Sequence, residues 1–186
     1  MADDPRTRMV AGAASLIGMR GVGATSVREL ARFTGAPLGS TYHYFPGGKD
    51  QLVDEALAWV CVRTERLIAS CDDAVAALDA FVASWRRLLE ETDYRASCPV
   101  LAVAAEEPGR GDDPPPSTAV FQRWHTLIVD TLRRDGVAPE QADALAWTVL
   151  ASVEGAVVLA RSQRSAAPLD AVAGTLRSLV AAAVER

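Results

Sequence analysis

The segment from Thr25 to Leu52, TSVRELARFTGAPLGSTYHYFPGGKDQL, carries the start and stop signals of two short helices separated by a turn. Ser26 followed three residues later by Glu29 is a capping box, which begins a helix by satisfying its free backbone N–H groups. Gly35 suits the left-handed position just past a helix end, and Pro37 pre-sets the backbone for a new helix. The segment therefore predicts a helix, a turn, a second short helix and the start of a third.

The second short helix, about Pro37 to Phe45, carries hydroxyl and aromatic side chains that suit a DNA surface. Such groups donate hydrogen bonds to phosphates and base edges, as recognition helices of helix-turn-helix proteins do. The expected DNA-binding residues are Ser26, Arg28, Leu38, Gly39, Ser40, Tyr42, His43 and Lys49, of which Ser26, Arg28 and Lys49 are phosphate candidates at helix starts. An ordinary helical hairpin produces the same local pattern, so the motif alone leaves both interpretations open.

Several motifs together resemble the N-terminal domain of the tetracycline-repressor (TetR) family of transcription factors: TSVRELA, GAPLGSTYHYF and GGKDQLVDEAL, all within roughly the first 60 residues. SCPVLAVAAEE, from Ser97, and SVEGAVVLARSQRSAAPLD, from Ser152, resemble the branch of that family typified by the lincomycin-resistance repressor. The chain departs from the family pattern in two places. Thr41 stands where Leu, Ile or Val is usual, and the link Pro46-Gly47-Gly48 is one residue longer than the commonest form.

Composition and periodicity predict an all-α fold. The chain has 186 residues, 49% of them hydrophobic, and contains no period-2 run bounded by turns. About nine helices are expected, with the prolines of the segment Pro108 to Ser117 marking a loop before the seventh. The resemblance implies a helix-turn-helix DNA-binding domain over residues 1–48 and a helical ligand-binding and dimerisation domain over residues 49–186.

The net charge of −5 is unevenly distributed along the chain. Residues 1–50 carry six basic and four acidic side chains, whereas the remainder carries 13 basic and 20 acidic ones. A basic end attracts phosphate, while an acidic body disfavours indiscriminate binding to nucleic acid. The distribution supports an N-terminal DNA-binding part, although a difference of this size also arises by chance.

The C-terminal part is expected to bind an apolar or aromatic small-molecule effector, as the resemblance implies. Aromatic side chains supply apolar contact area, and a histidine or a carboxylate supplies a polar anchor. The ligand-binding candidates are Phe81, Trp85, Leu101, Phe121, Trp124, His125, Trp147, Val153 and Glu154. Ordinary core packing is the alternative explanation for each of them.

The last two helices are apolar around more of their circumference than one buried face requires. With the resemblance, this favours a homodimer in which these helices pack against a second copy of the chain. Two recognition helices about 34 Å apart would then read a pseudo-palindromic operator in double-stranded DNA. Burial of both faces within a monomer is the alternative.

Other classes of protein find little support in the sequence. The three cysteines have no paired spacing and the chain opens without a signal segment, so a cytoplasmic protein is expected. No uncharged apolar run reaches the roughly 18 to 20 residues of a membrane span. The histidines and cysteines have no metal-ligand spacing, and no nucleophile elbow or phosphate-binding loop appears, so neither a cofactor nor an enzyme is expected.

The leading interpretation is a transcriptional regulator, expected to be a repressor, that binds its operator as a homodimer and is released by a small molecule. The alternative is a redox-responsive regulator controlled through Cys98. This residue precedes the helix expected from Pro99 to Glu106, and a helix N-terminus favours the reactive thiolate form.

Overall fold

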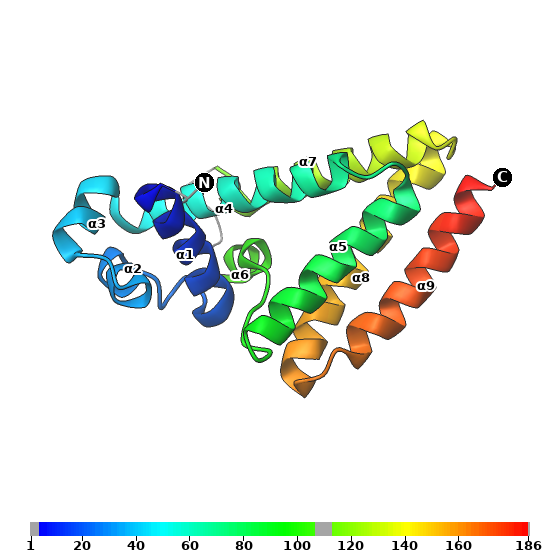
Figure 1. Ribbon diagram of the computed structural model, residues 1–186. Coiled ribbons are helices and arrows are strands. Elements are labelled where there is room, and N and C mark those ends of the chain that lie inside the picture. Colours follow the sequence, from blue (N-terminus) through cyan, green and yellow to red (C-terminus); the bar gives the residue numbers. More distant parts are fainter. Residues whose placement is uncertain (1–3, 107–112, 186) are drawn as a thin grey trace. The chain divides into compact units, whose positions relative to one another are not determined.

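The computed structural model describes residues 4–106 and 113–185. These residues form nine α-helices and no β-strand (Figure 1), which confirms the predicted all-α fold. The helices are α1 (Pro5–Arg20), α2 (Val27–Thr34), α3 (Leu38–Tyr44), α4 (Gly48–Ala69), α5 (Ala74–Glu91), α6 (Pro99–Glu106), α7 (Pro116–Arg134), α8 (Pro139–Gln163) and α9 (Ala167–Val184). The first half of the predicted loop from Pro108 to Ser117, residues 108–112, lies outside the described residues, and Ser117 itself is buried in the first turn of α7.

The helices form two compact units. The first consists of Met1–Val62 and Cys98–Val120, and the second of Arg63–Ser97 and Phe121–Arg186. Both α4 and α7 therefore contribute residues to each unit. The functional boundary expected between residues 48 and 49 remains a prediction, because compactness does not say which residues bind DNA.

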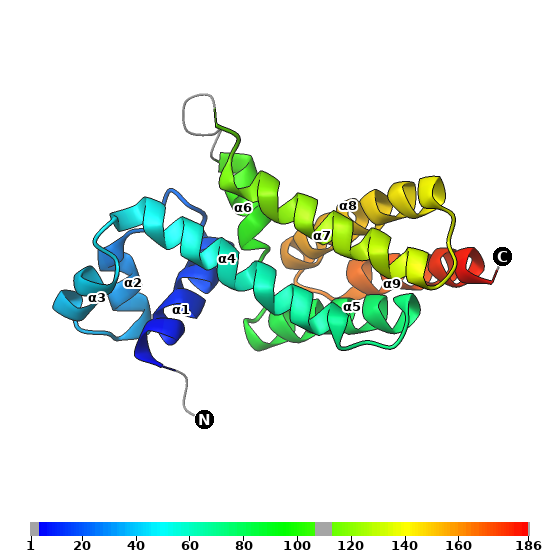
Figure 2. The same ribbon diagram turned by 90° about the horizontal axis from the view of Figure 1, so that it is seen from above.

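In the first unit, α1 packs against α2 and α6, and α2 packs against α3. α2 and α3 lie on one side of α1, and α6 lies on the other (Figures 1 and 2). The fully buried side chains of this unit include Leu16, Ile17, Leu30, Phe45, Leu52 and Val53. This apolar core fixes the short helices α2 and α3, which are too short to be stable alone.

The two ends of α2 are capped by the predicted residues, Ser26 and Gly35, but the Glu29 carboxylate has other partners than predicted. Ser26 Oγ accepts a hydrogen bond of 3.1 Å from the Glu29 N–H, and Gly35 has a left-handed φ of 69°. The Glu29 carboxylate, which the capping box directs back toward Ser26, instead forms ion pairs with Arg20, at 3.7 Å, and with Arg32. The predicted reciprocal bond was wrong because two guanidinium groups are stronger partners for a carboxylate than one backbone N–H.

Thr41 occupies the core position where an aliphatic residue is usual. Its side chain is fully buried, and its hydroxyl donates a hydrogen bond of 3.0 Å to the Pro37 carbonyl oxygen one turn earlier. A buried hydroxyl is costly mainly when it lacks a partner. The intrahelical bond therefore explains how the core accepts this polar residue.

The turn between α1 and α2 is held by a residue from α6. Glu106 Oε2 accepts a hydrogen bond of 2.8 Å from the Gly23 N–H, across 83 residues of sequence. Gly21, which ends α1, has φ 80° and ψ 171°, a conformation open essentially to glycine alone. A Cβ atom on Gly21 would also overlap the Glu106 carboxylate. The turn thus needs glycine both for its backbone and for the close approach of Glu106.

We expect Gly21→Ala to lower the free energy of unfolding by about 3 kcal/mol, because the backbone conformation is strained for alanine and because the Glu106 side chain must move away and lose its hydrogen bond to Gly23. The control is Gly35→Ala, which shares a positive φ but has open space around its Cβ position, and which should cost about 1 kcal/mol. Urea denaturation of both variants measures the difference. Equal losses would show that Glu106 contributes no crowding at Gly21.

In the second unit, α8 packs against α9, and α5 packs against both. Two ion pairs connect α5 to α9, namely Arg86 with Asp170 and, at 3.2 Å, Asp79 with Arg177. The hydrogen bond and the charge of Asp170 raise the pKa of Arg86 above its ordinary value. These pairs are exposed, so they contribute little to stability and mainly fix how the two helices align.

By length and composition alone, α8 and α9 are apolar enough to cross a membrane. This is weak evidence, because core helices of soluble proteins pass the same test. The expectation of no membrane span rested on charge, and charged residues do interrupt both helices. Glu154 is buried in α8, while Asp170 and Arg177 of α9 form the ion pairs to α5.

Candidate nucleic-acid interface

The recognition-helix candidate α3 has one buried and one exposed face. Thr41 and the following Phe45 are fully buried, which attaches the helix to the core of the first unit. The structure brings the five predicted contact residues of this helix together on exposed positions: Leu38, Gly39, Ser40, Tyr42 and His43. Leu38 and Tyr42 are 41% and 50% exposed, so a leucine and a phenol point away from the core on the same short helix.

The three phosphate candidates lie at the starts of α2 and α4. Arg28 and Lys49 are exposed in the first turns of these helices, where a cation faces solvent. Ser26 is half-buried, and its oxygen already serves as the N-terminal cap of α2. Arg20 and Arg32 form ion pairs with Glu29, which makes them weaker candidates for phosphate contacts.

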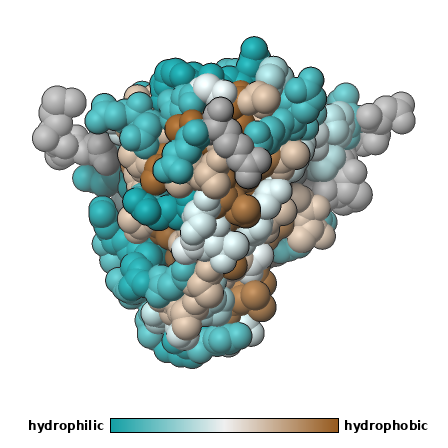
Figure 3. Space-filling view, turned by 90° about the vertical axis from the view of Figure 1, so that its right-hand side faces the viewer, coloured by the Kyte–Doolittle hydropathy of each residue, from teal (hydrophilic) through white to brown (hydrophobic). Residues whose placement is uncertain are grey.

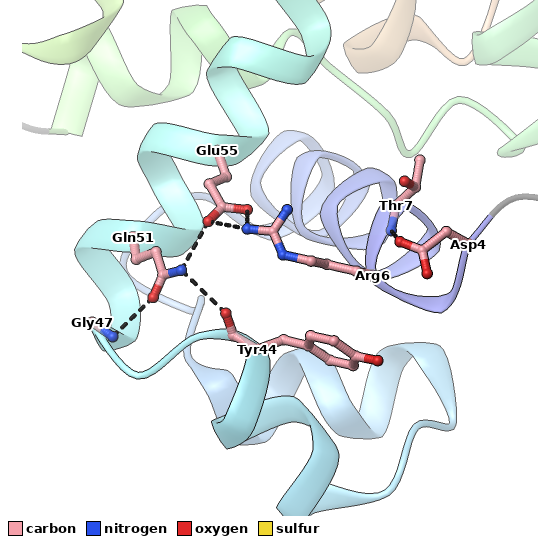
Figure 4. A network of polar contacts seen from close by, with 7 residues as sticks. All are labelled: Asp4, Arg6, Thr7, Tyr44, Gly47, Gln51 and Glu55. Carbon is pink, nitrogen blue, oxygen red and sulfur yellow. Dashed lines mark hydrogen bonds and ion pairs between the residues drawn. The ribbon is translucent and has the colours of Figure 1, made fainter.

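A polar network ties α4 to α1 and to the end of α3 (Figure 4). The Gln51 amide oxygen accepts a hydrogen bond from the Gly47 N–H at 2.8 Å, and its nitrogen donates to the Tyr44 carbonyl oxygen at 3.1 Å and to Glu55 Oε1 at 2.8 Å. Glu55 in turn accepts two hydrogen bonds from Arg6, at 2.6 and 2.7 Å. Sequence reasoning missed this network, although the i, i+4 spacing of Gln51 and Glu55 was a signal for its central contact.

The network accommodates the long link Pro46-Gly47-Gly48. Gly48 has a φ of 67°, and its N–H donates a hydrogen bond of 3.1 Å to the Phe45 carbonyl oxygen. The preceding N–H group, that of Gly47, donates a hydrogen bond to the Gln51 amide oxygen. The extra residue is therefore absorbed in a closed turn, and α4 begins at Gly48, directly before Lys49.

Four of the predicted ligand-binding residues form an aromatic cluster in the second unit. The ring of Phe81 meets the rings of Trp85 and Trp124 edge-on, with centroids 6.3 and 6.4 Å apart, and Phe121 meets Trp124 at 5.9 Å. Both tryptophans are buried, and neither indole N–H has a hydrogen-bond acceptor among the described residues. This geometry is that of a packed core with two unused donors.

The remaining candidates lie elsewhere. His125 stacks on Trp147 with ring centroids 4.2 Å apart, and its Nε2 lies 3.3 Å from Asp143 Oδ1. Trp147 is 48% exposed, so it faces solvent in a single copy of the chain. Val153 and Glu154 are buried in α8, whereas Leu101 belongs to α6 and the first unit.

A small cavity lies inside the second unit. It is lined by Ile68, Ala74, Ala77, Leu78, Phe81, Ile128, Thr131, Leu132, Val149 and Val180. The space open to a water-sized sphere is about 30 Å³, enough for only one or two waters. Phe81 is the member that it shares with the predicted ligand-binding set, and its other walls are almost entirely aliphatic.

The three cysteines of the chain are Cys61, Cys71 and Cys98. Cys98 is fully buried at the start of α6, and none of the three cysteines, all within the described ranges, is in a disulfide. In residues 4–106 and 113–185, no cluster of three or more histidine, cysteine, aspartate or glutamate side chains is arranged to hold a metal ion.

The fold and the exposed α3 define a helix-turn-helix protein with a separate helical body. Residues 9–56 match the model of the tetR family of bacterial regulatory proteins, and residues 74–175 match the C-terminal domain of LmrA/YxaF-like transcriptional regulators. The chain belongs to the TetR family of DNA-binding transcriptional regulators, in the branch that contains LmrA. This family consists of regulators and is not a family of enzymes.

Two relatives and one solved structure illustrate the similarity. An HTH-type transcriptional regulator of Mycobacterium tuberculosis is 40% identical over 184 residues, covering 96% of this chain and 95% of the relative. LmrA of Bacillus subtilis is 25% identical over 184 residues, covering 95% and 97% of the two chains. A TetR transcriptional regulator from Legionella pneumophila has the same fold, with a TM-score of 0.80 at 19% identity over 96% of this chain and 98% of the other.

Proposed function

We propose that this regulator is a repressor that binds a pseudo-palindromic operator as a homodimer and is released by an apolar or aromatic small molecule. The observation that carries the DNA part is the exposure of α3, in which all five predicted contact residues are exposed while Thr41 is buried. A location in the cytoplasm, where bacterial DNA is found, belongs to the same proposal.

The exposed residues of α3 divide into two roles in this proposal. Leu38 offers an apolar contact for a thymine methyl group, and Ser40 offers a hydroxyl for base edges. Tyr42 and His43 donate to phosphates, as do Arg28, Lys49 and the N-terminus of α2 at Ser26. Gly39 presents no side chain, which lets the backbone approach the base edges closely.

Exposed apolar side chains on α8 and α9 support the homodimer. Trp147, Val158, Leu159 and Leu179 are 43–52% exposed on the two helices. Figure 3 shows brown, hydrophobic atoms among pale ones on the face of the molecule that carries α9. A surface of this kind on a two-fold axis would bury the same residues from both copies and place two copies of α3 on one operator.

The effector is expected to enter the second unit. The cavity beside Phe81 has apolar walls but is far smaller than the roughly 300 Å³ or more of a typical ligand site. Binding therefore requires side chains to move apart, and a ligand that favours the opened state shifts the population toward it. Redox control through Cys98 gains no support, because its buried position keeps oxidants from the sulfur.

Selection of bound fragments from a random pool of double-stranded DNA tests the function. We expect the selected sequences to share a pseudo-palindrome, whose half-sites are about one helical turn apart. A pool without enrichment would contradict sequence-specific DNA binding, and an asymmetric single site would contradict the dimeric mode.

We expect Gly39→Ala to stabilise the protein and yet weaken binding to the selected DNA about 10-fold. Nothing described in the structure lies within 4 Å of a Cβ at Gly39, so alanine should raise the free energy of unfolding by about 0.5 to 1 kcal/mol. The same methyl group would keep the α3 backbone away from the bases. Thermal unfolding and fluorescence anisotropy measure the two effects.

The control for Gly39→Ala is Ser84→Ala on an exposed position of α5, which improves helix propensity far from α3 in the sequence. It should leave DNA affinity unchanged. If Gly39→Ala also leaves the affinity unchanged, the α3 backbone does not approach DNA at this point.

A further inference from the structure

We propose that Gln51 is a positioning residue of the DNA-binding surface, which holds Lys49 and the last turn of α3 in the register needed to contact phosphates together. This inference rests on the proposed function, because it assigns Lys49, Tyr42 and His43 to the DNA backbone. It adds a residue that touches no DNA itself but sets the geometry of those that do.

The Gln51 amide has a single orientation that satisfies its surroundings. Its oxygen faces a donor, the Gly47 N–H, and its nitrogen faces two acceptors, the Tyr44 carbonyl oxygen and Glu55 Oε1. Rotation of the amide by 180° would place donor against donor and acceptor against acceptor. The side chain therefore acts as a directional clamp and not only as a spacer.

The contacts of Gln51 fall on both sides of the link between α3 and α4. Tyr44 is the last residue of α3, and its carbonyl oxygen is one of those that a helix end leaves without an intrahelical partner. Gly47 lies in the link, directly before the start of α4 at Gly48. By bonding to both, Gln51 fixes how the end of α3, with Tyr42 and His43, is placed relative to Lys49 at the start of α4.

The short helix α3 depends on such external support. It has seven residues, and Pro37 at its start provides no side-chain cap in the described structure. A helix of this length does not form stably on its own in water. Its end is therefore positioned by what it contacts, and Gln51 supplies a contact to its final carbonyl group.

Glu55 and Arg6 fix Gln51 in turn (Figure 4). Arg6, in the first turn of α1, donates two hydrogen bonds to the Glu55 carboxylate, and its guanidinium lies 5.9 Å from the centre of the Phe45 ring. The carboxylate then receives the Gln51 amide. A chain of hydrogen bonds thus connects α1, α4 and the end of α3.

The test compares Gln51→Ala, Lys49→Ala and the double variant on the DNA that the wild-type protein selects. If Gln51 positions Lys49, its loss should weaken binding about 10-fold and also reduce the slope of log affinity against log salt by about one per subunit, as loss of a phosphate contact does. The double variant should bind no more weakly than the weaker single variant, because both substitutions remove the same contact.

A second pair of variants separates positioning from general stability. Gln51→Glu keeps the size of the side chain but sets a carboxylate against Glu55, so it should weaken binding like Gln51→Ala. Combining it with Glu55→Gln restores a donor between the two positions and the original charge but no donor to the Tyr44 carbonyl oxygen, so it should recover only the part of the affinity that the added charge removed and none of the lost salt slope. Gln122→Ala, at an exposed position of α7, is the matched control and should change neither.

Three results would overturn the proposal: an undiminished salt slope in Gln51→Ala, an additive loss in the double variant, or a Lys49→Ala variant that binds like wild type. Each of these leaves the proposed function intact as long as the wild-type protein selects a DNA sequence. Failure of that selection would instead refute the proposed function itself.

Discussion

Replacing Leu159 and Leu179 together with aspartate should convert the proposed homodimer to a monomer and lower operator affinity at least 100-fold. The two leucines are 52% and 47% exposed in a single copy, so charged groups at these positions leave the monomer fold intact. In the proposed interface, each aspartate would be buried without a counter-charge, at a cost of several kcal/mol for each one. Sedimentation velocity gives the mass, and anisotropy titration at fixed salt gives the affinity.

The affinity should fall because a monomer has only one recognition helix, and not because any contact of α3 with DNA is lost. In a dimer, binding of the first recognition helix makes the second binding event intramolecular, which raises the overall affinity by roughly 100-fold or more. A monomer that binds one half-site loses this advantage even though every contact of α3 remains. The double variant should therefore retain its helical content and weak half-site binding.

The matched control carries the same added charge on α7, where Gln122 and Thr126 are both exposed. Gln122→Asp with Thr126→Asp should remain a dimer and bind the operator as the wild type does. A Leu159→Asp, Leu179→Asp protein that still sediments as a dimer would place the interface elsewhere. A monomeric variant with undiminished affinity would show that dimerisation is not needed for operator binding.

The helix boundaries that sequence reasoning predicted well are those set by local signals. The helix expected from Pro99 to Glu106 has these bounds in the structure, and Gly35 ends α2 in the left-handed conformation. Proline and glycine act through their own backbone, so their effect can be predicted from neighbouring residues. The start of α7 was predicted less well, because the loop was expected to extend to Ser117, whereas Pro116 and Ser117 lie within the first turn of the helix and Ser117 is buried there.

The candidate site also has one part that local sequence predicts and one part that depends on tertiary contacts. The exposed face of α3 follows from helical periodicity, which places Thr41 inward and its neighbours outward. The contacts of Arg6 with Glu55 and of Glu106 with Gly23 join residues 49 and 83 positions apart. Such contacts depend on tertiary packing and have no signature in a local pattern.

Packing also explains why the second unit was harder to predict. A tryptophan in the sequence is equally compatible with the wall of a ligand site and with the hydrophobic core. The structure places Trp124 in the core and Trp147 at an exposed position. The cavity is lined mainly by aliphatic residues that no sequence pattern distinguishes from other core residues. Its volume depends on how several helices pack together, which composition does not determine.

Phe81→Ala should lower the free energy of unfolding by about 3 to 5 kcal/mol and make the protein bind small aromatic molecules. Phe81 is 5% exposed, lines the existing cavity and contacts the rings of Trp85 and Trp124. Removing its ring joins that space to the cavity, and since apolar cavities of about 150 Å³ bind benzene, we expect the enlarged cavity to admit the similar molecule toluene. Bound toluene should restore about 2.7 kcal/mol at a concentration 100-fold above its dissociation constant.

The same variant tests whether this cavity is where an effector acts. If opening the space around Phe81 is coupled to release of DNA, toluene should weaken operator binding by Phe81→Ala and leave the wild type unaffected, because the wild-type cavity is too small to admit it. Leu89→Ala is the control, since Leu89 is fully buried in the same helix and does not line the cavity. It should be destabilised by about 2 to 5 kcal/mol without acquiring a response of DNA binding to toluene. Toluene that stabilises Phe81→Ala and yet leaves its operator affinity unchanged would separate this cavity from the control of DNA binding, and the effector would then have to act at another place in the second unit.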